Sequence, residues 1–298
     1  MSGPDFFIVG APKCGTTALA KLLNDHSEVE FSKEKEPHFF DYTYQEGVDF
    51  YLKKYFSDGK DGSIKGEATP SYLMIPYVPS RIYQEFGKVK IIVLLRDPVE
   101  RAFSSWWMLY SRGMERLNFS DAIKEDYGNS SIWSDPDLEK FWIDHIHCLE
   151  KGKALPLRTY LESGYYYKHI ERYFRYFGRD NVKVVFSDEL QNNYELIMAD
   201  ILKFIGVEDF DSMPNLSREN EASGSGSVYL LRFSQKLGLQ RVRRFLPNSL
   251  INLLKKGLSR IGEKPVLDSS TRSEVKKYFV DSNKELEHLL GVDLRRWS

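Results

Sequence analysis

A short apolar strand that leads directly into a glycine-bounded loop and a helix constrains this chain more than any other feature. Residues 6–9 read Phe-Phe-Ile-Val, residues 10–17 read Gly-Ala-Pro-Lys-Cys-Gly-Thr-Thr, and a helical pattern begins at residue 18. Gly10 and Gly15 allow the backbone to turn tightly and to approach a ligand. The free N–H groups and the dipole at a helix N-terminus favour a bound phosphate. The segment therefore predicts a phosphate-binding loop.

This loop departs from the nucleotide-binding P-loop at one position. Its glycines have the P-loop spacing, but Thr16 stands where the P-loop has its lysine, and the loop's own lysine is Lys13. An enzyme that uses Mg-ATP would also need an aspartate at the end of an apolar strand to hold the metal. The strand expected at 90–95 is followed by Arg96, which precedes Asp97. We therefore expect a nucleotide with phosphates at both ends, bound without a metal ion.

Composition limits the class of protein. The 298 residues, of which 42% are hydrophobic, can form one large core, so we expect a single domain over residues 1–298. The net charge of −1 gives no general attraction to nucleic acid or to an anionic membrane, so anion binding must be local. Cys14 and Cys148 are far apart, which argues against a disulfide and for a reducing compartment. Cys14 could act as a nucleophile, but a small loop residue is the simpler interpretation.

Nothing in the sequence predicts insertion into a membrane. The N-terminus lacks the basic and apolar pattern of a signal peptide, and the longest aliphatic run, at 91–95, is far below the ~20 residues of a membrane span. The expected location is therefore the cytoplasm. Neither a nucleic-acid partner nor a stable membrane insertion is expected, and the oligomeric state is left open.

Three apolar runs indicate the fold. The runs at 6–9, 90–95 and 182–186 are typical of buried parallel strands, and segments with helical periodicity separate them. This alternation predicts an α/β fold, with a P-loop-like parallel sheet flanked by helices on both faces. Ligands of such sheets bind beyond the carboxyl ends of the strands, where the loops that begin at Gly10, Arg96 and Ser187 should meet.

Four further segments are expected to lie outside this framework. Residues 42–62 and 111–137 are rich in polar residues and glycine, which predicts irregular segments over the site. Residues 217–227 have almost no apolar content, which predicts a mobile loop that could act as a lid. Residues 228–264 contain nine basic residues and one acid between apolar positions. They predict a packed basic helical segment, and contact with an anionic ligand or a membrane surface stays open.

A second anion-binding signal follows the strand at 90–95. Arg96 leaves the strand end, where a guanidinium can hold a phosphate through two hydrogen bonds. Ser104, about two helical turns further along, can add a hydroxyl donor. By itself an Arg-Asp-Pro turn is more often an ion-paired helix start than a ligand site. Together with the phosphate loop, it favours a second phosphate position.

Residues 33–41, which read Lys-Glu-Lys-Glu-Pro-His-Phe-Phe-Asp, contain the candidate catalytic groups. Glu36 and His38 are two positions apart, so an extended backbone would turn both side chains to the same side. A carboxylate among lysines, with a histidine beside it, can serve as a general base. In isolation the same residues could form a solvated charge run with a structural histidine.

Four motifs, in this order, resemble those of the PAPS-dependent sulfotransferases. They are most similar to the branch that includes the heparan sulfate sulfotransferases and many bacterial relatives. Segments later in the chain are similar too, so the resemblance covers nearly its whole length. The motifs are Gly-Ala-Pro-Lys-Cys-Gly-Thr-Thr at 10–17, Lys-Glu-Pro-His-Phe-Phe-Asp at 35–41, Gly-Glu-Ala-Thr-Pro-Ser-Tyr at 66–72 and Leu-Arg-Asp-Pro-Val-Glu-Arg-Ala-Phe-Ser at 95–104, and the later segments are 163–166, 184–190 and 283–297.

The resemblance implies a sulfotransferase with 3′-phosphoadenosine 5′-phosphosulfate (PAPS) as its donor and adenosine 3′,5′-bisphosphate (PAP) as its product. Glu36 would be the catalytic base, accompanied by His38 and Asp41. Arg96 and Ser104 would hold the 3′-phosphate. The loop residues that would hold the 5′-phosphosulfate are Pro12, Lys13, Cys14, Gly15, Thr16 and Thr17, with Lys13 at the bridging oxygen.

Two departures from the family bear on the acceptor. Relatives that act on heparan sulfate have a lysine at the position of Ala68, and a Lys-Gly-aromatic cofactor clamp where this chain has Ser-Gly-Ser-Gly-Ser at 223–227, with Tyr229 as a possible aromatic substitute. Heparan sulfate is therefore not the expected acceptor. We expect a hydroxyl or an amine on a small intracellular metabolite, with a carbohydrate or glycolipid acceptor as the alternative.

Two other functions remain open at this point. A P-loop kinase of a small molecule would require Mg²⁺ and ATP. A non-catalytic protein that binds a nucleotide or a membrane surface would use the basic residues of 228–264. The presence of both Glu36 and Lys13 argues against the second alternative.

Overall fold

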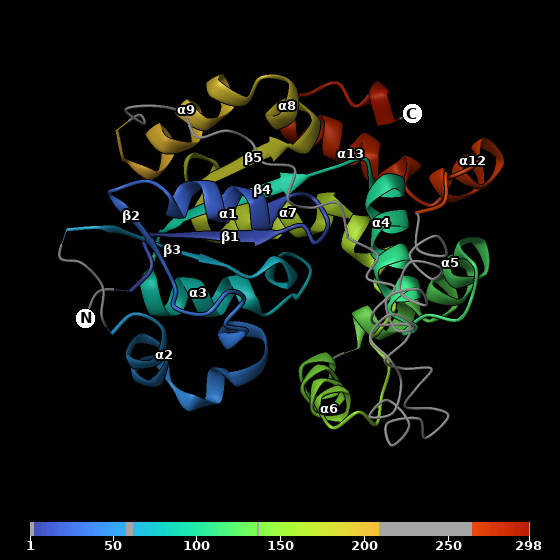
Figure 1. Cartoon of the computed structure of the whole chain (residues 1–298), viewed down its shortest axis with the longest axis horizontal. Coiled ribbons are helices and arrows are strands. Elements are labelled where there is room, and N and C mark those ends of the chain that lie inside the picture. The colour runs from blue at the N-terminus through green and yellow to red at the C-terminus, as the bar shows by residue number, and fades with distance from the viewer. Residues whose placement is uncertain (1–2, 58–61, 136, 209–263, 298) are drawn as a thin grey trace, which may run out of the picture.

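The computed structural model describes residues 3–57, 62–135, 137–208 and 264–297. Five strands form one sheet in the order β2-β3-β1-β4-β5, and all neighbouring strands are parallel. The predicted α/β fold with a parallel sheet is confirmed (Figure 1). The strands are β1 (Phe6–Gly10), β2 (Val29–Phe31), β3 (Ile64–Ala68), β4 (Lys90–Leu95) and β5 (Val182–Phe186).

The apolar runs predicted β1, β4 and β5 but missed β2 and β3. β2 has only three residues, and β3 reads Ile-Lys-Gly-Glu-Ala, so neither forms an apolar run. Gly66 of β3 pairs with Phe6 of β1, and a Cβ atom at Gly66 would lie 2.4 Å from the Phe6 ring. The ring thus covers the position that lacks a side chain, which lets a glycine-containing strand pack tightly in the sheet.

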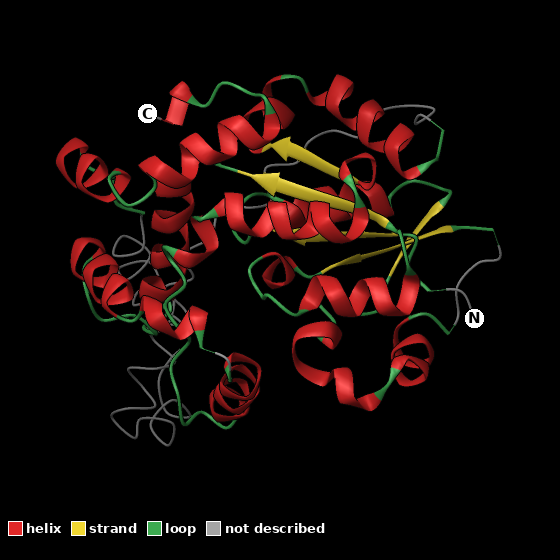
Figure 2. Cartoon of the chain, turned by 180° about the vertical axis from the view of Figure 1, so that it is seen from behind, coloured by secondary structure: helices red, strands yellow, loops and turns green. Residues whose placement is uncertain are grey.

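Helices cover both faces of the sheet (Figures 1 and 2). α1 (Thr16–Asn24) contacts β1, β2 and β3 on one face, while α3 (Val78–Phe86) and α7 (Tyr166–Phe177) lie together on the other. The other helices are α2 (Val48–Tyr55), α4 (Pro98–Ser111), α5 (Phe119–Gly128), α6 (Leu138–Glu150), α8 (Ser187–Asn192), α9 (Tyr194–Ile205), α12 (Ser269–Lys276) and α13 (Val280–Leu290). Short helical turns are η1 (Phe39–Thr43), η2 (Tyr44–Glu46), η3 (Pro70–Leu73), η4 (Ser130–Ser134), η5 (Glu162–Gly164), η6 (Arg179–Asn181) and η8 (Arg295–Trp297).

The prediction of irregular segments at 42–62 and 111–137 is wrong, because α2 and α5 lie there. α2 buries Tyr51, whose ring stacks on Phe39 with 4.6 Å between ring centroids. α5 begins after Asn118, whose side chain accepts a hydrogen bond from the third residue of the helix and so caps it. Burial of aromatic residues and a helix cap outweigh the high polar content of both segments.

Two predictions for the C-terminal half of the chain concern residues outside the described ones. They are the mobile loop at 217–227 and the basic segment at 228–264, apart from Lys264 at its end. The single domain over residues 1–298 therefore stays a prediction. Within the described part of the chain, no helix is both long and apolar enough to cross a membrane.

Candidate active site

The phosphate loop connects β1 to α1 at the carboxyl edge of the sheet. The N–H of Ala11 donates to the carbonyl of Leu94 in β4 at 2.7 Å, which holds the start of the loop beside the next strand. Gly15 has a φ of 93°, and a Cβ there would touch only Leu94, at 4.0 Å. Its left-handed backbone therefore favours glycine. At Gly10 the reason is close packing, because a Cβ would lie 2.5 Å from Leu73 of η3.

The N-terminus of α1 is open to an anion. The first N–H groups of a helix have no partner within it. Gly15 offers no capping side chain, and the first turn contains no acidic residue. Side chains cap α4, α5 and α12, whereas α3 and α7 resemble α1 in this respect, so it is the glycine-bounded loop before α1 that distinguishes its N-terminus. The loop residues therefore fit a phosphate or a phosphosulfate group.

Lys13 interacts with several other positive charges. Its Nζ atom is 3.6 Å from the Sδ atom of Met108 in α4. Burial of the amine lowers the pKa of Lys13, and the charges of four neighbouring cations lower it further. Such a concentration of positive charge favours a bound anion. The four cations are Arg112, Lys264, Arg96 and Lys35.

One line of accessible side chains on α4 lies along this group of charges. From the start of α4 to Leu109 every residue is buried except Glu100, Ser104 and Met108. These three are four positions apart, so they lie on the same face of the helix. Because Met108 contacts Lys13, this face adjoins the phosphate loop. The structure thus places Ser104 on the face of α4 that adjoins the loop.

Arg96 follows β4 directly and lies beside the same face of α4. Its Nη2 atom is 3.5 Å from a carboxylate oxygen of Glu100. Its carbonyl accepts a hydrogen bond of 2.9 Å from the hydroxyl of Tyr166. The side chain of Arg96 is 37% exposed, so the guanidinium can be reached by a ligand. The two predicted anion positions, at the loop and at Arg96, are therefore neighbours.

Glu36, His38 and Asp41 form a row of interacting side chains. The Nδ1 atom of His38 lies 3.0 Å from a carboxylate oxygen of Asp41, and its Nε2 atom lies 3.9 Å from one of Glu36. Asp41 is fully buried and accepts a hydrogen bond of 2.9 Å from Ser71. Burial lowers the pKa of His38, but the hydrogen bond with Asp41 and the charges of Asp41, Glu36 and Glu67 raise it overall. The buried carboxylate thus orients the imidazole toward Glu36.

Of the three predicted catalytic residues, the structure places Glu36 and His38 side by side, and the charge of Lys35 relates them to Lys13. The Nζ atom of Lys35 is 2.9 Å from a carboxylate oxygen of Glu36, and the charge of Lys35 acts on Lys13. The two-residue spacing of Glu36 and His38 suggested an extended backbone, but the backbone of this segment is not extended. Among the described residues, the non-glycine residues with positive φ are Lys13 at 72°, Glu36 at 57° and His38 at 53°. Such conformations are uncommon and cluster at functional sites.

Two hydroxyl groups, those of Ser187 and Tyr166, fix the loop, although the sequence predicted no such contact for either side chain. The Oγ atom of Ser187, at the start of α8, lies 2.6 Å from the carbonyl of Cys14 and 2.9 Å from that of Leu95. The hydroxyl of Tyr166 lies 3.8 Å from the Cys14 Sγ atom. The expectation that loops after β1, β4 and β5 meet is therefore confirmed. The position of Ser187 directly after a strand was the available signal.

Two further groups have shifted pKa values. Burial raises the pKa of the Cys14 thiol to about 11, which removes the possibility of a thiolate nucleophile near neutral pH. Glu67 is fully buried, and burial raises its pKa to about 7, although hydrogen bonds from Thr69 and Tyr51 oppose this shift. Cys14 therefore serves the loop through its backbone, and Glu67 connects β3 to Tyr51 of α2 and to Thr69.

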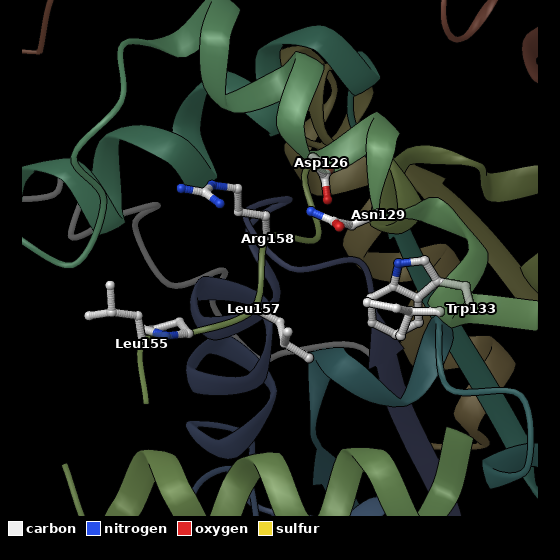
Figure 3. Close-up of a pocket in the computed structure, with 8 residues that line it drawn as sticks. Asp126, Asn129, Trp133, Leu155, Leu157 and Arg158 are labelled. Carbon is white, nitrogen blue, oxygen red and sulfur yellow. The ribbon is translucent and has the colours of Figure 1, made fainter. Parts of the chain in front are cut away.

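A separate cavity of about 230 Å³ lies between the end of α5, η4 and residues 155–158 (Figure 3). Its lining is mainly apolar and includes Trp133. Arg158 at its edge is paired with Glu115 at 2.7 Å and with Glu125 at 3.0 Å. None of the predicted catalytic or anion-binding residues lines this cavity, so it is distinct from the anion site.

Comparison with known proteins points to one family. A family model of the sulfotransferase domain matches residues 3–252. Heparan sulfate glucosamine 3-O-sulfotransferase 5 of Homo sapiens is 29% identical over 295 residues, which are 98% of this chain and 73% of that protein. The bifunctional heparan sulfate N-deacetylase/N-sulfotransferase 4 of Mus musculus is 27% identical over 311 residues, 99% of this chain and 31% of that protein. The crystal structure of a sulfotransferase from Alicyclobacillus acidocaldarius aligns with a TM-score of 0.69 and 25% identity, and covers 100% of this chain and 99% of its own.

Proposed function

This chain belongs to the sulfotransferase domain family and is a sulfotransferase, and we propose that it transfers a sulfuryl group from PAPS to a hydroxyl or amine of a carbohydrate. The observation that carries this proposal is the uncapped N-terminus of α1 beside the cations around Lys13. PAPS has a phosphosulfate at one end and a phosphate at the other. Two neighbouring anion positions, at the loop and at Arg96, suit such a ligand.

The loop and α4 would hold the donor in this proposal. Pro12 to Thr17 would surround the 5′-phosphosulfate, and Arg96 with Ser104 would hold the 3′-phosphate. Ser187 and Tyr166 would keep the loop in register with β4 through their contacts to Cys14. When bound, PAPS supplies the sulfuryl group: its sulfur bonds to the acceptor, and its phosphate leaves with the electron pair of the broken bond.

The catalytic residues would act on the acceptor and on the leaving charge. Glu36 would accept the proton of the attacking hydroxyl or amine, while His38 and Asp41 orient Glu36. Lys13 and the loop N–H groups would stabilise the negative charge that develops on the departing phosphate oxygen. Positioning and electrostatic stabilisation of this kind provide most of the rate in the related phosphoryl transfers. None of these roles requires a metal ion.

The relatives change the acceptor that we favour. The sequence alone favoured a small metabolite, but the relatives named above carry heparan sulfate in their names, which supports a sugar acceptor. Relatives that act on heparan sulfate have a lysine where this chain has Ala68. Ala68 lies at the end of β3 and is 4% exposed, so this chain lacks the positive charge of that lysine. We therefore propose a carbohydrate that is less sulfated than heparan sulfate. The cytoplasmic location expected from the sequence stays a prediction.

The test is transfer of ³⁵S from labelled PAPS to a panel of acceptors in the presence of EDTA. The panel contains unsulfated glucosamine oligosaccharides, their N-sulfated counterparts and small phenols. Label on a sugar, absent with Glu36→Gln, supports the proposal. Label found only on the phenols would instead favour a small metabolite as the acceptor. Phosphate transfer in a parallel assay with Mg-ATP and no EDTA, together with no sulfate transfer from PAPS, would instead identify a kinase.

A further inference from the structure

Residues 264–276 lie against the N-terminal half of α4. Arg272 in α12 forms ion pairs with Asp97, at 2.5 Å, and with Glu100. Its guanidinium therefore spans the two acidic residues that flank the start of α4. Lys264 lies 5.0 Å from the centre of the Phe103 ring, one residue before Ser104. This part of the chain thus adds two cations beside Arg96.

Arg96 and Arg272 share one carboxylate. One oxygen of Glu100 accepts a hydrogen bond from Arg272, and the other lies 3.5 Å from Arg96. A separation of 3.5 Å is at the long limit of a hydrogen bond, so Arg96 is only loosely attached. Because Arg272 also pairs with Asp97, its one positive charge is shared between the two carboxylates next to Arg96.

We propose that Arg272 is a positioning residue that keeps Arg96 available for the nucleotide phosphate, an inference that rests on the proposed function. Glu100 is four residues after Arg96, a spacing at which the two side chains can pair closely. Without Arg272, Glu100 would gain a free oxygen and hold Arg96 in a two-point ion pair. The phosphate would then have to displace that pair and approach an uncompensated carboxylate.

If Arg272 acted only through its positive charge, a different result would be expected from the double variants. Loss of Arg272 removes one positive charge, and neutralisation of either Asp97 or Glu100 would restore the net charge. If Glu100 instead forms a close ion pair with Arg96, only a change of Glu100 itself should restore phosphate binding. Asp97 is suited to the comparison, since asparagine can replace aspartate as the helix cap that binds the N–H groups of Val99 and Glu100.

The experiment measures the Kd of PAP by calorimetry, without Mg²⁺, for the full-length chain. Arg272→Gln should weaken binding about tenfold, as expected for loss of one charged hydrogen bond to the ligand. Arg272→Gln with Glu100→Gln should bind within about twofold of Glu100→Gln alone, whereas Arg272→Gln with Asp97→Asn should stay weak. Arg175→Gln, which removes an exposed ion pair with Glu171 on α7, is the control and should bind as the wild type does.

The possible failures are distinguishable. An unchanged Kd in Arg272→Gln, or equal recovery in the two double variants, would overturn the positioning role while the donor assignment stands. Weak binding in both double variants, with a lowered melting temperature, would mean that Arg272 only stabilises the fold. If the wild type itself does not bind PAP, the donor assignment is wrong and this inference falls with it.

Discussion

The ammonium group of Lys13 lies 3.6 Å from the sulfur of Met108, so the only lysine of the phosphate loop rests on a neutral thioether. Within the described part of the chain, no carboxylate pairs with Lys13, and the charges of four cations act on it. The positive charge is therefore available to an anionic ligand. The accessible face of α4 on which Met108 lies also carries Ser104 and Glu100, so one helix face connects the loop to Arg96.

Replacement of Lys13 should separate ligand binding from stability. Lys13→Met removes one charge from the site, so the affinity for PAP should fall about 10- to 100-fold. The melting temperature should stay the same or rise, because repulsion from the other cations is relieved. Lys53→Met, at an exposed position of α2, should change neither value. Calorimetry and thermal denaturation provide the two measurements, and unaltered affinity in Lys13→Met would refute the role of the lysine.

Replacement of Glu36 should affect turnover and not donor binding. Glu36→Gln removes the proton acceptor, so kcat should fall by about 10²- to 10⁴-fold. The Kd of PAP should remain within about twofold, because Glu36 belongs to the acceptor side of the site. Glu34→Gln makes the same change at an exposed neighbouring position and is the control. Equal turnover of the two variants in the ³⁵S-transfer assay would exclude Glu36 as the base.

Ser187 should contribute to stability through the loop. Its hydroxyl is buried and lies within hydrogen-bond distance of the carbonyls of Cys14 and Leu95. Ser187→Ala leaves these carbonyls without that donor, which should lower the free energy of unfolding by about 1–3 kcal/mol. Ser273→Ala, which removes an exposed hydroxyl from α12, should cost much less. Urea denaturation measures the free energy of unfolding of both variants. A similarly small decrease in the two would show that Ser187 does not anchor the loop.

Glu67 should make stability depend on pH. Burial raises its pKa to about 7 in the folded chain, from 4.5. Between these pH values the folded chain binds more protons than the unfolded chain, so the contribution of Glu67 to the free energy of unfolding should fall as pH rises. Glu67→Gln should remove this contribution, whereas Glu195→Gln at an exposed position of α9 should not. Urea denaturation at pH 5 and pH 7 tests the difference, and parallel pH dependences for the wild type and Glu67→Gln would contradict it.

Local sequence patterns were sufficient for the part of the site that one segment builds. The strand, the two glycines and the helix start lie within residues 6–23, so their spacing predicts the phosphate loop directly. Apolar runs likewise predicted β4 and β5 with their observed bounds. The position of Arg96 at a strand end followed from the same pattern.

The sequence predicted that the loops after β1, β4 and β5 meet, but it did not predict which individual side chains of distant segments contact each other. Ser187 meets Cys14 across 173 positions of the chain, and Arg272 meets Glu100 across 172. Neither pairing leaves a periodic signal, because each depends on how the complete fold brings strand ends and helices together. β3 was missed because it forms no apolar run, and its glycine packs in the sheet because a ring from another strand, that of Phe6, covers it. The left-handed backbone at Glu36 and His38 is also a result of tertiary structure that residue type does not reveal.

Calorimetric titration of the purified protein with PAP and with ATP, each with and without Mg²⁺, tests the central claim most directly. We predict tight binding of PAP that does not depend on Mg²⁺, together with weak binding of ATP. A preference for Mg-ATP over PAP would contradict the account, because the site around Lys13 and Arg96 would then serve a nucleotide triphosphate and its metal ion.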